Sequence, residues 1–358
     1  MAQKQEITQD RRAKHHRAVI LGLAFILLGA IFLPAASYLI TGVTSVYAQT
    51  DQETNARAEF WRTIRQGHSG YSAVQGRESN VLIQNGGQNW RQIRTGPITV
   101  IGGWVIVGVI AVLLMFYVVR GPVKVENGRA GKLVPRWSLS ERVLHWYTAI
   151  LFIILAITGL SFLFGRSVLI PLLGAKGFSL WASFAYSAHN YLGPAFTIGV
   201  LVMIIVWFKN NLPEASDWQW FLQGGGMIKG KHPSAGKANA GEKLFVFWIG
   251  LLVIGIAACV SGLILDFPLF EQTRKTMQLA NMVHGITSII WITLMCGHTY
   301  LGSAGIQGAF EGMKTGSVDA NWAKQHHDVW YENLKDKKRS SDEQITSVAD
   351  NPKPAHSG

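Results

Sequence analysis

The stretch Thr276–Phe310 reads TMQLANMVHGITSIIWITLMCGHTYLGSAGIQGAF, and it decides the fold class of the chain. It contains no Asp, Glu, Lys or Arg, and it is longer than the roughly 20 residues that a helix needs to cross about 30 Å of hydrocarbon. A helix is favoured because it satisfies its backbone hydrogen bonds within one segment. The stretch therefore predicts a membrane-spanning helix that carries two histidines, His284 and His298.

Four more charge-free apolar blocks predict four further spans. The chain of 358 residues is 49% hydrophobic and only 15% charged, which is unlike an ordinary soluble enzyme. The last four of the five spans form two hairpins, the connectivity of a four-helix bundle. We therefore predict an all-α integral membrane protein. The four further blocks are residues 98–119, 143–165, 177–208 and 244–265.

The N-terminal region contains a sixth apolar run at residues 18–33, preceded by several basic residues. A small-residue site follows at Val46-Tyr47-Ala48. Residues 1–48 therefore read either as a cleaved signal peptide or as a membrane-anchoring helix, and both readings stay open. The predicted architecture is a four-helix transmembrane bundle with one or two extra N-terminal spans.

The net charge of +12 indicates membrane topology rather than a nucleic-acid partner. Of the 33 Lys and Arg, 23 lie before residue 18, in 120–142, in 209–243 and after residue 303, in segments that alternate with the other loops. The positive-inside rule places these basic segments in the cytoplasm. We expect a multi-pass protein in the lipid of a bacterial cytoplasmic (inner) membrane, with a cytoplasmic C-terminus and, if uncleaved, a cytoplasmic N-terminus.

After residue 48, the chain is predicted to consist of five parts. Glycines and amides within residues 84–90 predict turns in the first of these. The charged, proline-ended end of the last part is expected to be disordered. The parts are a periplasmic segment at 49–97, an extra transmembrane helix at 98–119, a basic cytoplasmic linker at 120–142, a four-helix domain at 143–310 and a cytoplasmic tail at 311–358.

Four of the eleven histidines lie within the predicted spans, where an ionisable side chain is costly and indicates function. His284 and His298 are 14 residues apart, so on one helix they differ by about 40° around the axis and by about 21 Å along it. His189 lies in the outer part of its span, and His145 lies at the cytoplasmic start of another. Depth therefore pairs His189 with His284 on the outer side and His145 with His298 on the inner side.

Two imidazoles that face each other in an apolar bundle suit a haem iron, which takes neutral axial ligands. A closed zinc site needs four ligands around one ion, whereas these histidines form two pairs about 21 Å apart. The alternative for any single histidine is a hydrogen-bonded bundle residue without a ligand. The two cysteines, Cys259 and Cys296, lie in spans, and the chain lacks the Cys-x-x-Cys-His motif of covalent c-type haem. The sequence thus predicts two b haems, with the four histidines as ligands of their iron.

Several other residues are candidates for contact with these haems. Gly159 follows His145 by 14 residues, so it repeats that face one leaflet further out and would leave room beside the outer macrocycle. Gly193, Gly262 and Gly285 are weaker candidates, since glycine is common at helix contacts in membranes. Two arginines, Arg136 and Arg142, either pair with haem propionates or anchor the chain at the cytoplasmic surface.

The chain also contains specific motifs both inside and outside the spans. They are ERVLHW at Glu141–Trp146, HNYLGP at His189–Pro194, NNLP at Asn210–Pro213, KANAGEK at Lys237–Lys243, and WAKQHH at Trp322–His327 followed by Trp330-Tyr331. On these motifs, Arg136–Tyr331 resembles the gamma subunit of membrane-bound formate dehydrogenase. That subunit is the cytochrome b that anchors a molybdenum or tungsten enzyme. Because residues 1–135 precede the resemblance, the chain is similar to a longer branch of this family with an N-terminal extension.

The resemblance implies partners and a reaction. The partners are an iron-sulfur beta subunit and a catalytic alpha subunit that oxidises formate, so formate chemistry would not occur on this chain. Electrons would pass to the outer haem, then to the inner haem, then to a membrane quinone. The position that matches the polar contact of the family's quinone pocket is Asn239, beside the inner ligand His298. From the residues alone, Asn239 reads as a loop residue or a helix N-cap.

Other functions remain as alternatives. Related cytochromes that serve nickel-iron hydrogenase or thiosulfate reductase would use the same haem geometry with another catalytic subunit. A transporter or a structural anchor would bind no haem. The run Gly225–His232 nearly spells a phosphate-binding loop, but it lacks the preceding strand and the hydroxyl that coordinates magnesium. The adjacent His326 and His327 are expected to be solvated or to contact a partner in the cytoplasm.

Overall fold

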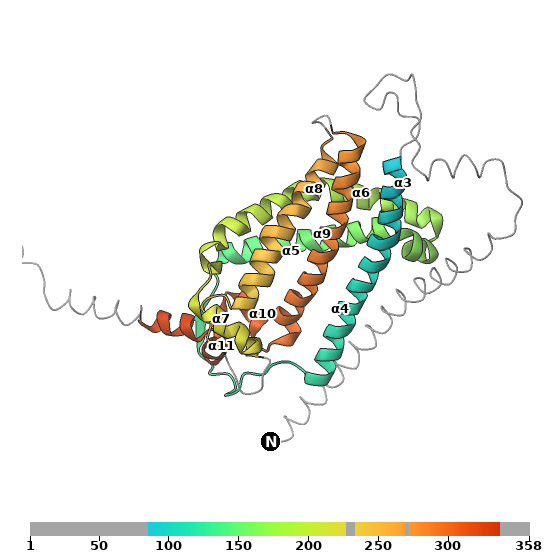
Figure 1. Cartoon of the computed structure of the whole chain (residues 1–358). Helices are drawn as coiled ribbons and strands as arrows, with labels where there is room; N and C mark the ends of the chain where they lie inside the picture. The colour runs from blue at the N-terminus through green and yellow to red at the C-terminus, as the bar shows by residue number, and fades with distance from the viewer. Residues whose placement is uncertain (1–84, 227–232, 269–271, 337–358) are drawn as a thin grey trace, which may run out of the picture. The chain divides into compact units, whose positions relative to one another are not determined.

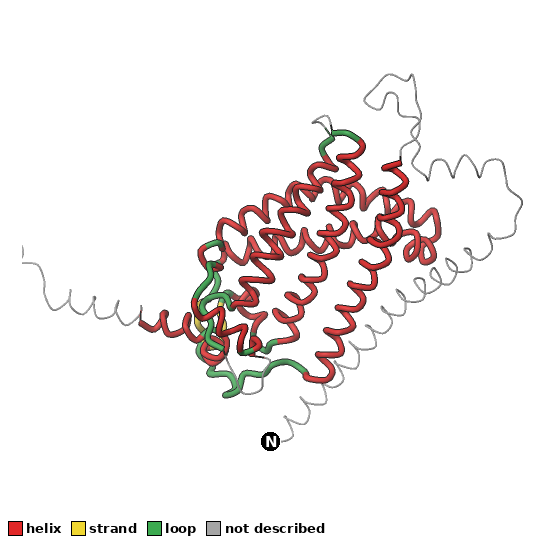
Figure 2. Tube along the Cα trace, in the orientation of Figure 1, coloured by secondary structure: helices red, strands yellow, loops and turns green. Residues whose placement is uncertain are grey.

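The computed structural model describes residues 85–226, 233–268 and 272–336 (Figures 1 and 2). The predicted anchor at 18–33, most of the predicted periplasmic segment and the end of the predicted tail lie outside these residues. The described chain is almost entirely helical, and its two strands are short. Its longer helices are α3 Asn85–Ile93, α4 Thr99–Arg120, α5 Leu139–Phe164, α6 Ile170–Trp207, α7 Ala215–Leu222, η5 Glu242–Gly255, α8 Ile256–Asp266 and α9 Arg274–Tyr300.

Short elements link these helices and form the region that follows α9. Five short helices are η1 Arg94–Ile98, η2 Gly165–Leu169, η3 Lys209–Asn211, η4 Gly224–Gly226 and η6 Leu301–Gly305. They are followed in the chain by α10 Ala309–Thr315 and α11 Ala320–His326, and the two strands are β1 Leu133–Pro135 and β2 Ser317–Asp319. Residues 328–336 are also helical.

Four helical stretches are long and apolar enough to cross a membrane, which makes this a multi-pass membrane protein. They are Asn89–Arg120, Leu139–Trp207, Glu242–Asp266 and Arg274–Gly305. The second contains 69 residues, several times the length of one crossing. It folds back on itself, because the rings of Phe152 and Phe196 lie 6.0 Å apart and Trp181 Nε1 donates to Ser161 Oγ at 2.9 Å. Counted as two crossings, this hairpin gives the five spans predicted.

The reversal occurs at non-helical residues between α5 and the main part of α6. Phe164 has φ −112° and ψ 2°, and Gly174 has φ 70° and ψ 169°. The second conformation is readily available only to glycine. The predicted interruption at residues 166–176 is therefore a pair of sharp breaks with short helical turns between them.

The ends of two spans are set by capping residues. At the start of α5, the Ser138 N–H donates to Glu141 Oε2 at 2.8 Å, and the Glu141 N–H donates to Ser138 Oγ at 3.3 Å. The same reciprocal bonding joins Asn239 and Glu242 at the start of η5. These are capping boxes, which satisfy backbone donors that a helix start leaves free. The N-cap reading of Asn239 is confirmed.

The described residues fall into two compact units. The first contains residues up to Gly121, Thr148–Gly199 and Ile254–Gly297; the second contains Pro122–Tyr147, Val200–Val253 and the residues from His298 onward. Several helices pass from one unit into the other along the chain. Each unit contains one of the two predicted histidine pairs.

In the first unit, α3, η1 and α4 run beside α9 in the same chain direction (Figure 1). Trp90 Nε1 donates to Asn281 Oδ1 at 3.2 Å. Further along, Ile98 faces Gly285 and Gly102 faces Ile289. The turns predicted for residues 84–90 are wrong from Asn85 onward, because this segment continues the helix and is fixed by the contact with Asn281.

In the second unit, the linker and the tail pack against each other. Strand β1 pairs with β2 in antiparallel register, with Val134 opposite Val318. Val318 is fully buried in a cluster with Val125, Trp322 and Ala323. The tail is therefore folded as far as residue 336, and the last predicted span ends early. Ile306 has extended φ and ψ angles and bridges to Val123.

A buried cation lies next to this cluster. The Arg136 guanidinium stacks on the rings of Trp137, Trp322 and Trp330 at 4.9–5.4 Å, and burial lowers the Arg136 pKa to about 10. His327 is 2% exposed, and its Nδ1 bonds the Gly236 carbonyl at 2.8 Å. Burial holds the His327 pKa well below its usual value, and the Arg136 charge adds to this effect. The expectation of a solvated or partner-facing His327 is wrong, since the motif joins two parts of its own chain.

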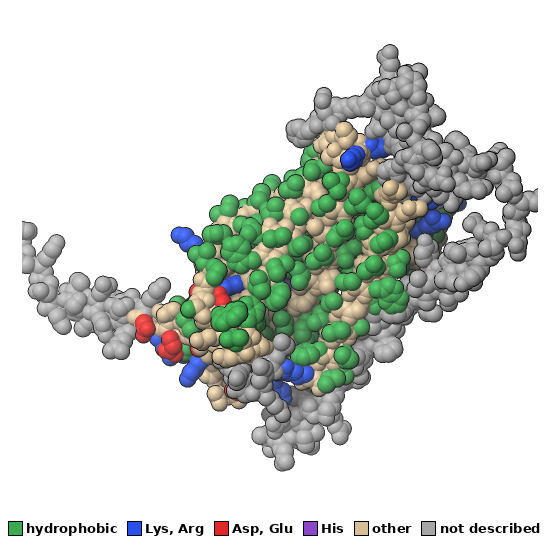
Figure 3. Space-filling view, viewed as in Figure 1, with side chains coloured by type: hydrophobic (Ala, Val, Ile, Leu, Met, Phe, Trp, Pro, Cys, Tyr) green, Lys and Arg blue, Asp and Glu red, His purple; other side chains and the backbone are tan. Residues whose placement is uncertain are grey.

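The helices carry a largely apolar outer surface, as expected in lipid (Figure 3). On α5, Ile150, Ile153 and Ile157 recur at helical spacing, and each is more than half exposed. Figure 3 also shows Lys and Arg side chains at the ends of the helices rather than along them. This distribution matches membrane-spanning segments with charged flanks.

Candidate functional site

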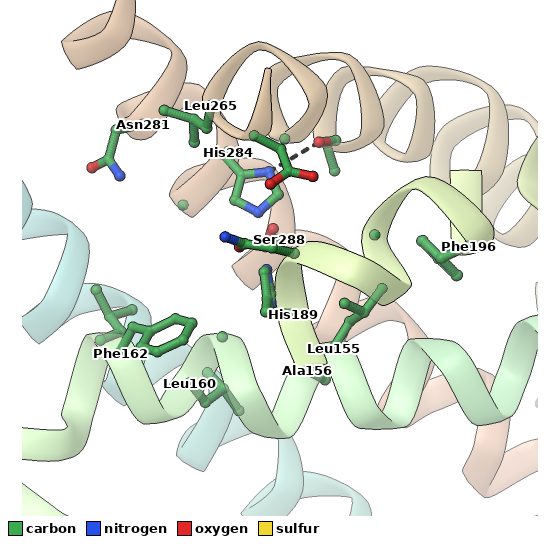
Figure 4. A pocket seen from close by; sticks show the side chains of 18 of the residues that line it. Leu155, Ala156, Leu160, Phe162, His189, Phe196, Leu265, Asn281, His284 and Ser288 are labelled. Atoms are coloured by element: carbon green, nitrogen blue, oxygen red, sulfur yellow. Dashed lines mark hydrogen bonds between the residues drawn. The ribbon is translucent and has the colours of Figure 1, made fainter. Parts of the chain in front are cut away.

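The first unit brings His189 of α6 and His284 of α9 face to face. Their ring centroids are 6.1 Å apart, and the ring planes are nearly perpendicular at 88°. Figure 4 shows the His284 ring above the His189 ring, with Ala156 and Leu160 of α5 below them. A histidine nitrogen lies about 2 Å from a metal ion and about 1 Å from its own ring centre, so two histidines on opposite sides of one ion have centroids about 6 Å apart.

The His284 ring is oriented by the backbone of α8. Its Nδ1 lies 2.9 Å from the Ala258 carbonyl and 3.4 Å from Ser261 Oγ. The carbonyl only accepts, so Nδ1 carries the proton and Nε2 keeps its lone pair. The Ser261 hydroxyl donates to the Ala257 carbonyl at 2.6 Å. A fixed tautomer with a free Nε2 is the arrangement that orients a metal-binding histidine.

The His189 ring is oriented by a threonine. Thr158 Oγ1 lies 2.8 Å from His189 Nδ1 and donates its own proton to the Ile154 carbonyl, also at 2.8 Å. Because the hydroxyl proton is committed to Ile154, its oxygen accepts from Nδ1–H. Thr158 is 1% exposed, so this bond is shielded from water. The lone pair of His189 Nε2 is therefore free, as it is in His284.

Two glycines leave space for these rings. A Cβ added at Gly159 would lie 3.2 Å from His189 Cε1, and a Cβ added at Gly262 would lie 3.0 Å from His284 Cε1. Any larger residue would push against the imidazole. Gly159, predicted to leave room beside the outer macrocycle, lies against the ring of His189. Gly193 has nothing within 4 Å of such a Cβ, and Gly285 has only Ile98, at 3.6 Å.

A cavity of about 720 Å³ opens beside this pair, within the size range of small-molecule and cofactor sites. Its wall is mostly apolar and includes Phe152, Phe162, Phe196 and Trp291, and both histidines line it. Gly159, Gly193, Gly262 and Gly285 line it as well. The described residues thus provide an apolar chamber with two facing ring nitrogens, which suits a large flat macrocycle with an iron centre.

The second unit brings His145 of α5 and His298 of α9 together in the same way. Their ring centroids are 6.3 Å apart, with the planes at 55°. The Trp146 ring lies 5.2 Å from His145, and Phe310 packs against Trp146 at 6.1 Å. His145 Nδ1 is buried without a hydrogen-bond partner. Within the described part of the chain, no hydroxyl accepts from His145 as Thr158 does from His189.

One carboxylate interacts with a histidine of the inner pair. Glu242 interacts electrostatically with both His298 and Arg136. Arg142 donates through Nη1 to the Lys314 carbonyl at 2.9 Å, and its Nε is buried without a partner. Arg136 donates through Nη2 to the Lys237 carbonyl at 3.0 Å, while its Nη1 is buried and unpartnered. Each arginine therefore has one buried donor atom without a partner among the described residues.

Asn239 is held in place by the start of η5. Its Oδ1 accepts the Glu242 N–H at 2.9 Å, and its own N–H donates to Glu242 Oε2 at 3.0 Å. The capping bond uses the oxygen of the amide. The two capping bonds do not use the Nδ2 group. Trp220 packs against Gly241, two residues after Asn239.

Two other sequence candidates do not form sites. Gly224–Gly226 is a short helical turn that follows helix α7 rather than a strand, and residues 227–232 lie outside the described chain, so the strand-loop-helix context of a nucleotide site is missing here. His326 lies next to Trp322, with ring centroids 5.2 Å apart. Among the described residues, no group of three or more His, Cys, Asp or Glu side chains is arranged to hold a metal ion.

Residues 136–315, half of the chain, match the family model described as prokaryotic cytochrome b561. The chain belongs to this family. Family membership implies haem b. The two facing histidine pairs fit haem b. In the outer pair both Nε2 atoms are free, and Gly159 and Gly262 leave space beside the rings. The match begins at Arg136, so α3, η1 and α4 lie outside it.

Three curated relatives are similar to this chain. The nitrate-inducible formate dehydrogenase cytochrome b556(Fdn) subunit of Escherichia coli K12 is 28% identical over 228 residues, covering 60% of this chain and 98% of the relative. The formate dehydrogenase cytochrome b556(fdo) subunit of the same strain is 27% identical, covering 56% and 93%. The formate dehydrogenase cytochrome b556 subunit of Haemophilus influenzae is 26% identical, covering 58% and 86%. The resemblance inferred from the motifs is confirmed.

Sequence reasoning missed the residues that orient the outer ligands. Thr158, Ser261 and the Ala258 carbonyl contact the histidine rings but were not predicted. A usable signal was present, because Thr158 and Ser261 are polar residues in the middle of apolar spans. Such residues in membrane helices usually bond a backbone carbonyl or a functional group.

Proposed function

We propose that this chain is the cytochrome b subunit of a respiratory formate dehydrogenase and that it transfers electrons through two b haems to a membrane quinone. The observation that carries the proposal is the presence of two facing histidine pairs, with ring centroids 6.1 Å and 6.3 Å apart, on three helices of which α9 contributes to both pairs. The relatives, which are formate dehydrogenase cytochrome b subunits, support the choice of complex.

His189 and His284 are proposed to ligate the iron of the outer haem, and His145 and His298 that of the inner haem. Each bound haem would supply a one-electron carrier whose iron alternates between the ferric and ferrous states. The protein fixes ring orientation, excludes water with aromatic and aliphatic walls, and accepts Nδ1–H at Thr158 and Ala258. One helix, α9, would carry one ligand of each haem, 14 residues apart.

Asn239 is proposed to contact the quinone. Its Nδ2 group would donate to a quinone carbonyl, because its Oδ1 is already committed to the Glu242 N–H. This donor would strengthen as negative charge develops on the carbonyl oxygen during reduction. Quinone reduction takes two electrons and two protons, so a site near the cytoplasmic ends of the helices would draw its protons from that side.

The proposed partners are an iron-sulfur beta subunit and a molybdenum or tungsten alpha subunit. This chain has only two cysteines, whereas an iron-sulfur cluster commonly takes four thiolate ligands, so the cluster and the oxidation of formate are assigned to the partners. The proposed orientation has the outer pair on the periplasmic side and the C-terminus in the cytoplasm. The parallel run of α3–α4 and α9 supports it, since both helices then enter from the side opposite the basic segments.

The test is the reduced-minus-oxidised visible spectrum of the purified complex, with haem counted per chain. We compare the parent with His189→Ala and His298→Ala, and we use Ile286→Ala as the matched control. Ile286 lies two residues after His284 on α9, and its side chain is 45% exposed. We expect two b haems in the parent and in the control, and one in each histidine variant.

The second part of the test is electron delivery. Formate should reduce both haems in the parent complex, and an added quinone should reoxidise them. A parent without haem, or a control that loses haem as the histidine variants do, would refute the ligand assignment. An assembly that oxidises hydrogen and ignores formate would favour the hydrogenase alternative and would refute the choice of complex.

A further inference from the structure

The wall of the outer cavity includes a segment that precedes the family match. Arg94 and Ile98 line the cavity, and both belong to η1, between α3 and α4. Three successive contacts hold this segment against α9, at Trp90 with Asn281, at Ile98 with Gly285 and at Gly102 with Ile289. The segment is therefore an integral part of the outer site.

Arg94 stands out among the lining residues because of its charge. The only other lining residue with a formal charge is Asp266, at the end of α8, and no ion pair joins the two within the described chain. The Arg94 guanidinium lies 5.9 Å from the centre of the Trp90 ring. Trp90 is itself held by Asn281, about one turn before His284 on α9 (Figure 4). The cation is thus positioned at the cavity through a chain of contacts.

The local backbone explains why Arg94 occupies this position. Pro97 lies inside the helix and has no N–H to donate, and the helix widens to π-type hydrogen bonding over Arg94–Ile98. The Arg94 carbonyl accepts both the backbone N–H of Thr99 and its Oγ1 hydroxyl, the latter at 2.7 Å, and these two bonds hold the irregular turn. A single widened turn of this kind changes the direction of the side chains on the helix.

A cation beside an apolar chamber favours an anionic group on the molecule that fills it. Haem b has two propionate carboxylates, and Arg binds a carboxylate through two parallel hydrogen bonds. We propose that Arg94 binds a propionate of the haem held by His189 and His284, so that the N-terminal extension anchors the outer haem. This inference rests on the proposed haem site, and it adds a binding residue from outside the family match.

The inference predicts a shift in the reduction equilibrium of one haem. A positive charge near the iron stabilises the reduced form, which carries one more electron. For a cation in partial contact with solvent we expect roughly a tenfold effect on the reduction equilibrium constant, which is about 59 mV for one electron. Removal of the charge should lower the midpoint potential of the outer haem alone.

The experiment is an equilibrium redox titration of the intact complex with haem counted per chain. The variants are Arg94→Gln, which removes the charge, and Arg94→Lys, which keeps it. The matched control is Arg91→Gln, because Arg91 is an exposed cation one turn earlier that does not line the cavity. His189→Ala identifies which of the two potentials belongs to the outer haem.

We expect Arg94→Gln to lower the outer potential or to lose the outer haem, Arg94→Lys to restore most of the parent behaviour, and Arg91→Gln to match the parent. Unchanged haem content and potentials in Arg94→Gln would overturn the inference while leaving the proposed function intact. An equal shift in Arg91→Gln would also overturn it, since the effect would then be general surface charge. Absence of haem from the parent complex would overturn the proposed function and this inference together.

Discussion

Thr158→Val tests whether the hydrogen bond that orients His189, and not only His189 itself, contributes to binding of the proposed outer haem. Valine has nearly the shape of threonine, so the change removes one hydroxyl and leaves the packing of a fully buried position intact. It deletes the acceptor 2.8 Å from His189 Nδ1. A buried ring N–H would then lack its partner.

The size of the effect follows from the cost of an unsatisfied buried donor. That cost is about 1–3 kcal/mol, and each 1.4 kcal/mol is a factor of about ten, so outer-haem affinity should fall roughly 5- to 150-fold. Loss of a hydrogen bond to a metal-ligating histidine typically weakens metal binding by about 10- to 100-fold, which agrees. The Leu155 carbonyl is a second acceptor near His189, and the lower end of the range applies if the ring turns toward it.

The assay is transfer of haem from the purified complex to an excess of an apo-haem-binding acceptor protein, followed by its visible spectrum. The control is Thr293→Val on α9, because the one partner of the Thr293 hydroxyl among the described residues is the Ile289 carbonyl of its own helix. We expect faster loss of one haem from Thr158→Val and parent behaviour from Thr293→Val. Equal haem loss in both variants, or parent behaviour in Thr158→Val, would refute the reasoning.

Three further predictions follow from single contacts. Gly159→Ala should lower the content of the outer haem, because the added Cβ would lie 3.2 Å from the His189 ring. The control Gly108→Ala on α4, where an added Cβ has nothing within 4 Å, should keep the parent content. The measurement is haem per chain, and equal content in both variants would contradict the prediction. Asn239→Asp should keep both haems and the helix cap but lose the Nδ2 donor, so haem reoxidation by quinone should slow, and an unchanged rate would exclude the quinone contact. His327 has a pKa well below 6.5 because it is buried, so the unfolded chain binds more protons and stability should fall as the pH drops below about 6.5, by up to about 1.4 kcal/mol per pH unit. Thermal unfolding between pH 7.5 and 5.5 should be less pH-dependent in His327→Gln, and an identical slope in that variant would contradict the assignment.

The sequence by itself determined which segments span the membrane and which side chains matter in them. Hydropathy is a property of contiguous residues, so a charge-free run predicts a span without knowledge of its neighbours. In the same way, the 14-residue spacing of His284 and His298 places both on one face of a helix, whatever that helix packs against. Depth in the bilayer then limited the partners of each histidine, and the structure brings the same two pairs together.

Only the tertiary structure decided how these spans meet. Nothing local in residues 85–120 specifies that they run beside α9 or that Arg94 lines the outer cavity. Thr158 reads as an ordinary polar residue until α6 brings His189 within 2.8 Å of its hydroxyl. Likewise, His327 resembles a solvated histidine until the tail folds against the linker and buries it beside Arg136. Contacts of this kind join residues far apart in the chain, so they depend on the packing of whole helices, which no short sequence pattern encodes.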